Sequence, residues 1–488
     1  MTSLAKKSLS GSITMLLLSV LQRGLGFLST AVLARLLTPE DYGVIAIINL
    51  VVFLIDSMST VGVGQYIIQK TKVDADDLNS AWTINLLIKN TFFASSALAM
   101  PFITAFLDKP DLLYPMLVTL LILPLSALST PGVYLLHKEL DLKPLFWMNL
   151  SVRLTVFAIT LVMAYVYRNY WALIFGTLFS YFLPVIGTYV IHPFRPRISF
   201  LKFHEQWGFS KWIFFNSFVG YIKGQIDMFI ISKLYSSENI GGYNMMKNVA
   251  KMPEQILIAP LSSTFLSTYS NVKHDQHKLN QVANISFLGL SAILCPLSVF
   301  MFFNPLMIIN ILLGDKWFAY IDIFAVLALT LAVTPLSILT NNYSMALGSV
   351  KPYFYLNLFS VLLSTCVYFF IFQQPILYFA YAFLVISLIQ TLVTGAYFNI
   401  KLKMPVCFPL IHTLGLSALA FGLGYLFFPS QTTHLSVSAI SAYIGYFISF
   451  YFILAIIIYS IKSKIYEYYY IVDTVIQQLL NHLLKLMR

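Results

Sequence analysis

The chain has 488 residues, of which 59% are hydrophobic and only 10% are charged, and its formal net charge is +11. A soluble domain carries about 25% charged residues, so this composition excludes an ordinary soluble enzyme. Apolar runs of about 20 residues recur along the chain, each long enough to cross about 30 Å of hydrocarbon. No linker or low-complexity tract separates them. We therefore predict an all-α integral membrane protein without a soluble catalytic domain.

Hydropathy predicts about fourteen transmembrane helices. The first begins like a secretory signal, with Lys6 and Lys7 before an apolar run, but Gln22 and Arg23 interrupt that run and no small-x-small cleavage site follows. We therefore expect a first helix that is retained. The predicted spans cover approximately residues 11–34, 43–69, 80–107, 112–136, 145–167, 170–191, 210–233, 240–269, 282–312, 321–348, 353–372, 375–400, 408–428 and 436–461.

The basic residues are distributed unequally between the two sides of the predicted membrane. Of the 30 Lys and Arg residues, 19 fall on the side of the N-terminus, five on the opposite side and six within spans. Basic residues concentrate on the cytoplasmic side of membrane proteins, and an even number of spans returns the chain to its starting side. We therefore predict that both termini are cytoplasmic. The net charge arises mostly from this asymmetry, so we do not expect nucleic acid as a partner.

An internal repeat relates the two halves of the chain. Residues 35–43 (RLLTPEDYG) follow the first span, and residues 233–241 (KLYSSENIG) follow the seventh, at an offset of 198 residues. At the same offset, Asp56 aligns with Glu254 inside the membrane. Six spans separate the copies, and six is even, so both copies have the same orientation and are related by a pseudo-two-fold axis along the membrane normal.

The repeat and the charge pattern together predict four parts of the chain. Two six-helix lobes cover residues 1–200 and 201–403. A hairpin over residues 404–461 has no Lys, Arg, Asp or Glu, so it can face lipid, with apolar residues such as Leu423 on that face. The tail, residues 462–488, has an amphipathic pattern that predicts a helix on the cytoplasmic surface, with a frayed tail as the alternative.

Nine charged residues fall inside predicted spans and away from their ends, where each central charge costs roughly 2.5–3.5 kcal/mol on insertion scales. Such residues normally face a cavity or form pairs, although long basic side chains can also reach the membrane surface. The excess of three positive charges favours an anion such as a pyrophosphate. We predict that the basic residues bind the substrate and that the acids couple transport to an ion. The basic residues are Arg23, Lys89, Arg153, Lys223, Lys247 and Lys251, and the acids are Asp56, Asp227 and Glu254.

The positions of these residues separate the alternatives in part. Arg23 lies about 12 residues, or ~18 Å, from either end of its span, which is beyond the reach of an arginine side chain. Arg153 and Lys247 lie nearer a boundary, where reaching the surface is a real alternative. Polar residues follow one face of the first, second, seventh and eighth spans, so we expect these faces to meet across one central cavity.

Spacing also allows two of the charges to neutralise each other locally. Lys223 precedes Asp227 by four residues, and Lys251 precedes Glu254 by three, spacings at which helical ion pairs form. These pairs would leave Asp56 as the one acid for both Arg23 and Lys89. No metal or cofactor site is predicted, because no nucleotide-binding G-x-x-x-x-G-K-[ST] motif occurs and the three cysteines are widely spaced.

Four short segments carry a resemblance to a known family. They are residues 33–43 (LARLLTPEDYG), 138–140 (KEL), 241–244 (GGYN) and 314–317 (GDKW). Through them, and over most of its length, the chain resembles the polysaccharide-transport branch of the MOP exporter superfamily, the Wzx-type flippases of O-antigen and colanic acid assembly. The first segment is fairly specific, and the others are short.

The resemblance implies a fourteen-helix, two-lobed protein of the bacterial inner membrane. Such a protein moves undecaprenyl-diphosphate-linked oligosaccharide from the cytoplasmic to the periplasmic leaflet. Members use a cationic lumen for the sugar diphosphate, which Arg23, Lys89, Arg153 and Lys223 match by type and location. Their last two helices form a lipid groove, which here would be the hairpin at 404–461. Membrane lipids and the polysaccharide polymerase are the further partners that the resemblance implies.

Two other functions stay open on the sequence. A cation- or proton-coupled multidrug exporter of the same superfamily would need a more acidic lumen for a cationic drug. A membrane glycosyltransferase or ligase would need catalytic acids or a long outer loop, whereas the predicted outer loops are short. The transporter interpretation, without enzymatic activity, is therefore favoured.

Overall fold

The computed structural model describes residues 21–60, 62–139, 141–348, 350–402, 407–428 and 437–461. Within these ranges the regular structure is helical and no strand occurs, which confirms the all-α prediction. The predicted cytoplasmic tail, residues 462–488, lies outside the described residues.

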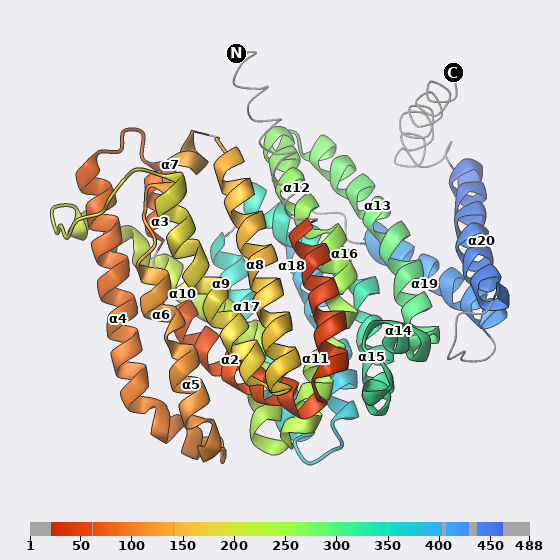
Figure 1. Cartoon of the computed structure of the whole chain (residues 1–488). Helices are drawn as coiled ribbons and strands as arrows, with labels where there is room; N and C mark the ends of the chain where they lie inside the picture. Colours follow the sequence, from red (N-terminus) through yellow and green to blue (C-terminus); the bar gives the residue numbers. More distant parts are fainter. Residues whose placement is uncertain are drawn as a thin grey trace, which may run out of the picture. The chain divides into compact units, whose positions relative to one another are not determined.

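The described helices follow the order of the predicted spans (Figure 1). Residues 21–36 form the first described helix, called the first helix below. The others are α2 (Pro39–Ser59), α3 (Val63–Gln69), α4 (Ala75–Phe106), η1 (Pro110–Leu112), α5 (Leu113–Leu120), α6 (Ile122–Ala127), α7 (Val133–Lys138), α8 (Lys143–Tyr167), α9 (Trp171–Ile191), α10 (Phe203–Leu234), α11 (Ser237–Leu257), α12 (Ala259–Val272), α13 (Gln276–Phe303), α14 (Pro305–Leu312), η2 (Asp315–Tyr320), α15 (Ile321–Ala328), α16 (Thr330–Ala346), α17 (Val350–Phe370), α18 (Leu377–Leu402), α19 (Cys407–Phe427) and α20 (Val437–Ile461).

Nine helical segments in the described part are long and apolar enough to cross a membrane, or up to ten if the bent pair of residues 315–328 and 330–346 counts as one span. This confirms a multi-pass membrane protein, while the count of fourteen stays a prediction. Among the predicted spans outside the nine are those of α10 and α11, whose polar and charged residues lower their mean hydropathy.

The segment 35–43 is a helix start. The Thr38 hydroxyl accepts a hydrogen bond from the Asp41 backbone N–H at 3.2 Å, and the Asp41 carboxylate accepts one from the Thr38 backbone N–H at 3.0 Å. Pro39 occupies the first turn of α2, where a missing N–H costs nothing. Asp41 also accepts from the Tyr170 backbone N–H at 2.9 Å, which ties the start of α2 to the start of α9.

Contacts group the described chain into two compact units. Unit 1 comprises residues up to Met245 together with Asn357–Ile376, and unit 2 comprises Met246–Leu356 together with the residues from Leu377 onward. The six-helix lobes inferred from the repeat are defined by sequence rather than by contact, so their boundaries stay a prediction.

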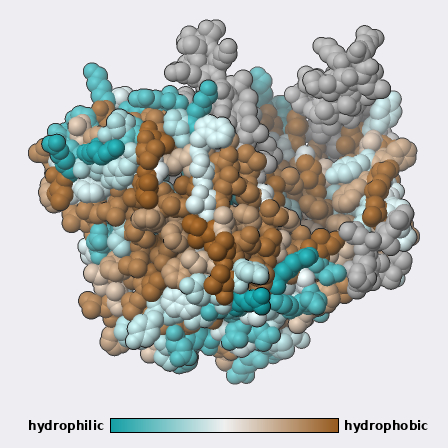
Figure 2. Space-filling view, in the orientation of Figure 1, coloured by the Kyte–Doolittle hydropathy of each residue, from teal (hydrophilic) through white to brown (hydrophobic). Residues whose placement is uncertain are grey.

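Unit 1 exposes a hydrophobic face. Leu98, Phe102 and Phe106 on α4 are 79%, 78% and 71% exposed, exposures that a soluble protein would not tolerate over a contiguous surface. Figure 2 shows hydrophobic residues along the middle of the face formed by α4, α5 and α8, with hydrophilic residues gathered toward its two ends. This is the pattern of a surface in contact with lipid.

The two copies of the repeat meet inside unit 1. A Cβ atom added at Gly43 would lie 1.6 Å from the carbonyl oxygen of Ser237, and one added at Gly241 would lie 1.8 Å from that of Pro39. Pro39 and Ser237 are themselves related by the 198-residue offset. A two-fold axis produces reciprocal contacts, in which equivalent residues of the two copies touch each other. The reciprocal contact between Gly43 and Gly241 therefore supports the predicted pseudo-symmetry.

In unit 2, the charge-free hairpin packs against α13. The Tyr446 hydroxyl of α20 donates to the Pro296 carbonyl at 3.0 Å, and α19 contributes to the same hydrophobic cluster. Our expectation that Leu423 faces lipid is wrong, since it is 8% exposed and belongs to this cluster. Leu414, on the same helix, is 71% exposed. Hydropathy cannot distinguish these two environments because both are apolar.

Candidate functional site: a cationic surface in the membrane interior

Arg23 on the first helix carries an unsatisfied buried group. Its Nη1 atom is buried and has no hydrogen-bond partner among the described residues. A guanidinium always carries its charge and presents five N–H donors, and a buried donor without an acceptor is costly. An anion placed against Arg23 would therefore relieve an existing penalty.

Arg153 of α8 lies against the same helix. A Cβ atom at Gly26 would be 2.9 Å from Arg153 Nη2, so this guanidinium lies directly against the backbone of the first helix. Gly26 follows Arg23 by three residues, which places both on one helical face. Arg153 thus contacts the first helix one turn from the residue that carries the Arg23 guanidinium, and two guanidinium groups can each bind oxygens of a diphosphate.

Lys89 of α4 has a defined acidic partner. Its ammonium lies 3.0 Å from Asp56 Oδ1 of α2 and donates to Ser126 Oγ of α6 at 2.7 Å. The Lys89 residue is 8% exposed. The sequence left Asp56 as a possible partner for both Arg23 and Lys89. The structure pairs Asp56 with Lys89.

Lys223 and Asp227 on α10 each contact a neutral partner. The Lys223 ammonium donates to Asn357 Oδ1 of α17 at 2.7 Å. Asp227, which is 1% exposed, accepts from the Tyr243 hydroxyl of α11 at 2.9 Å. The same helix packs against α2, where the Tyr221 hydroxyl donates to the Leu50 carbonyl at 2.9 Å. The second and seventh predicted spans, which carry two of the predicted polar faces, therefore pack against each other as α2 and α10.

Lys247 and Lys251 belong to unit 2. Both ammonium groups lie over the ring of Phe383 on α18, at 5.0 and 4.9 Å from its centroid, and so make cation–π interactions with one aromatic residue. Glu254 follows on the same helix and is partly buried. The placement of these three residues relative to Arg23 and its neighbours stays a prediction.

The sequence did not reveal the neutral partners of these charges, namely Ser126, Asn357, Tyr243 and Phe383. Neutral polar and aromatic residues are common in membrane helices, and no spacing sets these four apart. A polar side chain close to one of the predicted polar faces was the one usable signal for such partners. Many residues meet that condition, so it does not single these partners out. In the described ranges, no group of three His, Cys, Asp or Glu side chains is arranged to hold a metal ion.

A second set of charges lies beyond the ends of the predicted spans 43–69, 80–107 and 210–233, where α3, α4 and α10 begin or end. Lys70 Nζ is 2.6 Å from Asp77 and 3.7 Å from Glu205, and the Tyr66 hydroxyl donates to Glu205. The hydrogen bond that Lys70 donates to Asp77 raises the pKa of Lys70, and the hydrogen bond that Tyr66 donates to Glu205, with the nearby Lys70 charge, lowers the pKa of Glu205. Lys138, from the segment 138–140, donates to the Thr71 carbonyl at 3.0 Å.

Residues 32–322 match the family described as polysaccharide biosynthesis protein. The chain belongs to this family. The expected resemblance is thereby confirmed.

Two curated relatives show how far the similarity extends. The lipopolysaccharide biosynthesis protein WzxC of Escherichia coli K12 is 22% identical over 375 residues, which cover 74% of each protein. A membrane protein in the cps region of Klebsiella pneumoniae is 24% identical over 260 residues, so the chain spans about half (54%) of that relative's length.

Solved structures confirm the fold expected from the resemblance. The lipid II flippase MurJ, in an inward closed conformation, aligns with a TM-score of 0.71 and 16% identity over 93% of this chain and 99% of that one. An inward-facing multidrug resistance transporter of the MATE family, within the MOP superfamily, aligns with a TM-score of 0.58 and 12% identity over 80% and 98%. The chain therefore shares its fold with these two transporters.

Proposed function

We propose that the protein is a flippase that moves undecaprenyl-diphosphate-linked oligosaccharide from the cytoplasmic to the periplasmic leaflet by alternating access. The observation that carries the proposal is the buried Nη1 atom of Arg23, which has no hydrogen-bond partner within the described residues, with Arg153 against the same helix at Gly26. Family membership and the similarity to WzxC support the same class of cargo.

The charges of the site suit the head group of such a lipid. A diphosphate offers several acceptor oxygens, and a guanidinium binds two of them at once in parallel. Lys223, Lys247 and Lys251 would supply further positive charge to the cavity. Lys89 would contribute when its ion pair with Asp56 opens.

The polyprenyl tail would take a separate route. An apolar chain cannot enter a cationic cavity without losing its apolar solvation, so the tail stays in the lipid beside the hairpin of α19 and α20. Exposed residues such as Leu414 would contact it.

For the return step, we propose that the intramembrane acids take up a proton or a metal cation. Protonation of Asp56 would release Lys89, since the 3.0 Å ion pair requires the carboxylate. Glu254 occupies the equivalent position in the second copy, and Asp227 is a third candidate. A reconstituted protein whose transport ignores both a proton and a sodium gradient would contradict this step.

The proposal also places the protein in the bacterial inner membrane with both termini in the cytoplasm, and gives the polysaccharide polymerase as its downstream partner. A reporter enzyme that is active only in the cytoplasm, fused to either end, tests the orientation. Activity at one end alone would contradict an even number of spans.

A depletion strain provides the test of function. Loss of the protein should cause lipid-linked oligosaccharide to accumulate on the cytoplasmic leaflet, and wild-type protein should clear it. Arg23→Ala should fail to clear it, Arg23→Lys should retain part of the activity, and Arg168→Ala, at an exposed loop position, should behave as wild type. Export of a cationic drug without any change in the lipid-linked sugar would favour the multidrug alternative, and altered glycan composition would favour a glycosyltransferase or ligase.

A further inference from the structure

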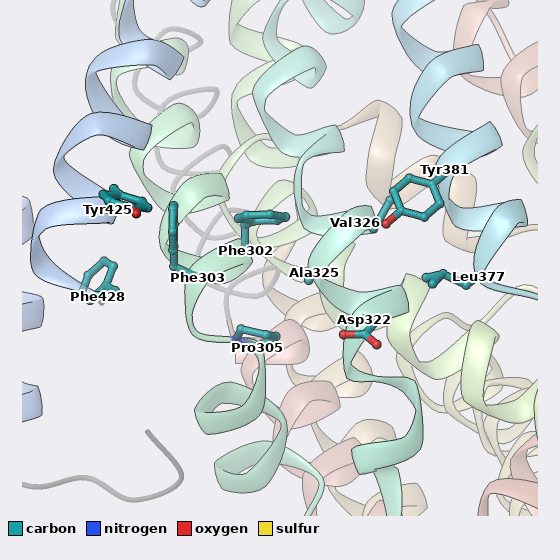
Figure 3. Close-up of a pocket in the computed structure, with 10 residues that line it drawn as sticks. All are labelled: Phe302, Phe303, Pro305, Asp322, Ala325, Val326, Leu377, Tyr381, Tyr425 and Phe428. Carbon is teal, nitrogen blue, oxygen red and sulfur yellow. The ribbon is translucent and has the colours of Figure 1, made fainter. Parts of the chain in front are cut away.

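A second cavity, separate from the basic residues, lies in unit 2. Its volume is about 570 Å³, within the range of about 300–1,000 Å³ typical of small-molecule sites. None of the six candidate basic residues lines it. The lining residues are Phe302, Phe303, Pro305, Asp322, Ala325, Val326, Leu377, Tyr381, Tyr425 and Phe428 (Figure 3).

The cavity lies where membrane helices end. Of the helices that line it, α13 ends at Phe303 and α19 at Phe427, whereas α14, α15 and α18 begin at Pro305, Ile321 and Leu377. Because α13, α18 and α19 are long enough to cross the membrane, we expect their neighbouring ends at the level of the lipid head groups. Two exposed tyrosines, Tyr381 and Tyr425, fit that level, where aromatic residues with a polar tip are enriched.

The two ends of the cavity differ in chemistry. Figure 3 shows Phe303, Tyr425 and Phe428 gathered at one end, and Asp322 with Tyr381 at the other. Asp322 is the one charged side chain among the ten lining residues, and it makes no hydrogen bond or ion pair within the described part of the chain. It lies in the first turn of α15, where the helix N-terminus stabilises its negative charge.

We propose that this cavity binds a membrane lipid with a primary ammonium head group. The ammonium pairs with Asp322 and lies near the ring of Tyr381, since carboxylates and aromatic faces both attract organic cations. The apolar chain lies over Phe302, Phe303 and Phe428. An anionic head group is disfavoured because the ten described lining residues offer it a carboxylate and no basic side chain.

A soluble saccharide fits the cavity less well. Seven of the ten lining residues are fully apolar, so most sugar hydroxyls would lose water without gaining a partner, which is costly. The inference goes beyond the proposed function, since the bound lipid differs from the transported one in charge and site. Its test measures binding and does not depend on transport.

The experiment compares lipids retained by the purified full-length protein. Protein is extracted from nanodiscs containing equal amounts of phosphatidylethanolamine and phosphatidylglycerol, and the retained lipids are counted by native mass spectrometry. Wild type should retain phosphatidylethanolamine in about threefold to fivefold excess, as expected for one partly exposed charge pair. Asp322→Asn should reduce that ratio to near one. Asp315→Asn, an exposed acid in a first helical turn outside the cavity, should leave it unchanged.

Tyr381→Leu provides a second variant that keeps the charge and removes the aromatic ring, and it should lower the ratio partway. An equal ratio in wild type would overturn the proposal, as would an unchanged ratio in both Asp322→Asn and Tyr381→Leu. If Asp315→Asn lowered the lipid ratio as much as Asp322→Asn does, the lipid preference would come from general surface charge, and the proposal would be wrong. Displacement of the retained lipid by methyl glucoside would instead identify a saccharide site.

Discussion

The contact between Gly43 and Gly241 offers a direct perturbation of the junction between the two repeats. Replacing either glycine by alanine adds one methyl group at the fifth residue of α2 or α11. Helix propensity alone would make the change favourable by about 1 kcal/mol. Any loss therefore reports the contact between helices rather than the helices themselves.

The distances set the size of the effect. The new Cβ atom at Gly43 would lie 1.6 Å from a backbone oxygen, whereas ordinary contact begins at 3.4 Å, so the helix starts would have to separate by about 1.8 Å. The obstructing atoms are backbone, which cannot rotate away. Overpacking of this kind costs about 1–3 kcal/mol. If that cost falls on the arrangement in which the repeats touch, the balance between transport states shifts by roughly 5–150-fold.

Alkylation of a buried reporter measures the separation. Ile240 is 0% exposed and adjoins Gly241, so Ile240→Cys in a background without native cysteines should react slowly with a soluble maleimide in purified protein. Addition of Gly43→Ala should raise the rate at least about fivefold, and Gly43→Ala alone should slow clearance of lipid-linked oligosaccharide.

Gly289→Ala is the matched control, because a Cβ atom there would have no neighbour within 4 Å. It should change neither the alkylation rate nor clearance. The reasoning is refuted if Gly43→Ala and Gly241→Ala behave like Gly289→Ala in both assays.

Three further predictions follow from other contacts. Lys89→Met should lower the free energy of unfolding by about 3 kcal/mol, because it leaves the mostly buried carboxylate of Asp56 without its partner. Adding Asp56→Asn should restore part of the loss. Thermal unfolding of both variants in one detergent measures this, and equal stability of the single and double variants would contradict the pairing. The pKa of Glu205 is lower in the folded protein than in the unfolded chain. Its stabilising contribution is therefore present above the ordinary glutamate pKa of about 4.3 and is lost as the pH falls through the lower pKa of the folded protein. The difference in unfolding free energy between wild type and Glu205→Gln should shrink on acidification, and a difference that grows would contradict the lowered pKa. Leu414→Arg should impair clearance of lipid-linked oligosaccharide more than it impairs membrane insertion. A tail-labelled, photoreactive substrate should crosslink to α19 and α20. Crosslinks to the first helix, α2 and α10 alone would place the tail in the cavity and contradict the prediction.

Much of the architecture follows from one-dimensional patterns. Hydropathy predicts the spans because each must match the thickness of the hydrocarbon core. Hydropathy begins the second span at residue 43, whereas α2 begins at Pro39, because Thr38 and Asp41 form a capping box and Pro39 fits the first turn. The offset of 198 residues predicts a two-fold relation, and the helix starts it relates touch reciprocally at Gly43 and Gly241.

The sequence also determines which charges must avoid lipid, because any ionised group within a span is costly there. Arg23, Lys89 and Asp227 were found by that rule alone. What it cannot provide is the partner of each charge. Asp56 was equally available to Arg23 and Lys89 on the sequence, and the structure pairs it with Lys89.

Only the tertiary structure decided these pairings, the buried position of Leu423, and the cavity beside Asp322. Helical periodicity fixes which residues share a face, but the rotation of each helix depends on side-chain packing against neighbours that are distant in sequence. Asn357 reaches Lys223 across 134 residues, a distance over which no local pattern carries information. Lipid and protein interior are equally apolar, so the apolar pattern of α19 specifies burial from water without specifying whether lipid or another helix covers each side chain.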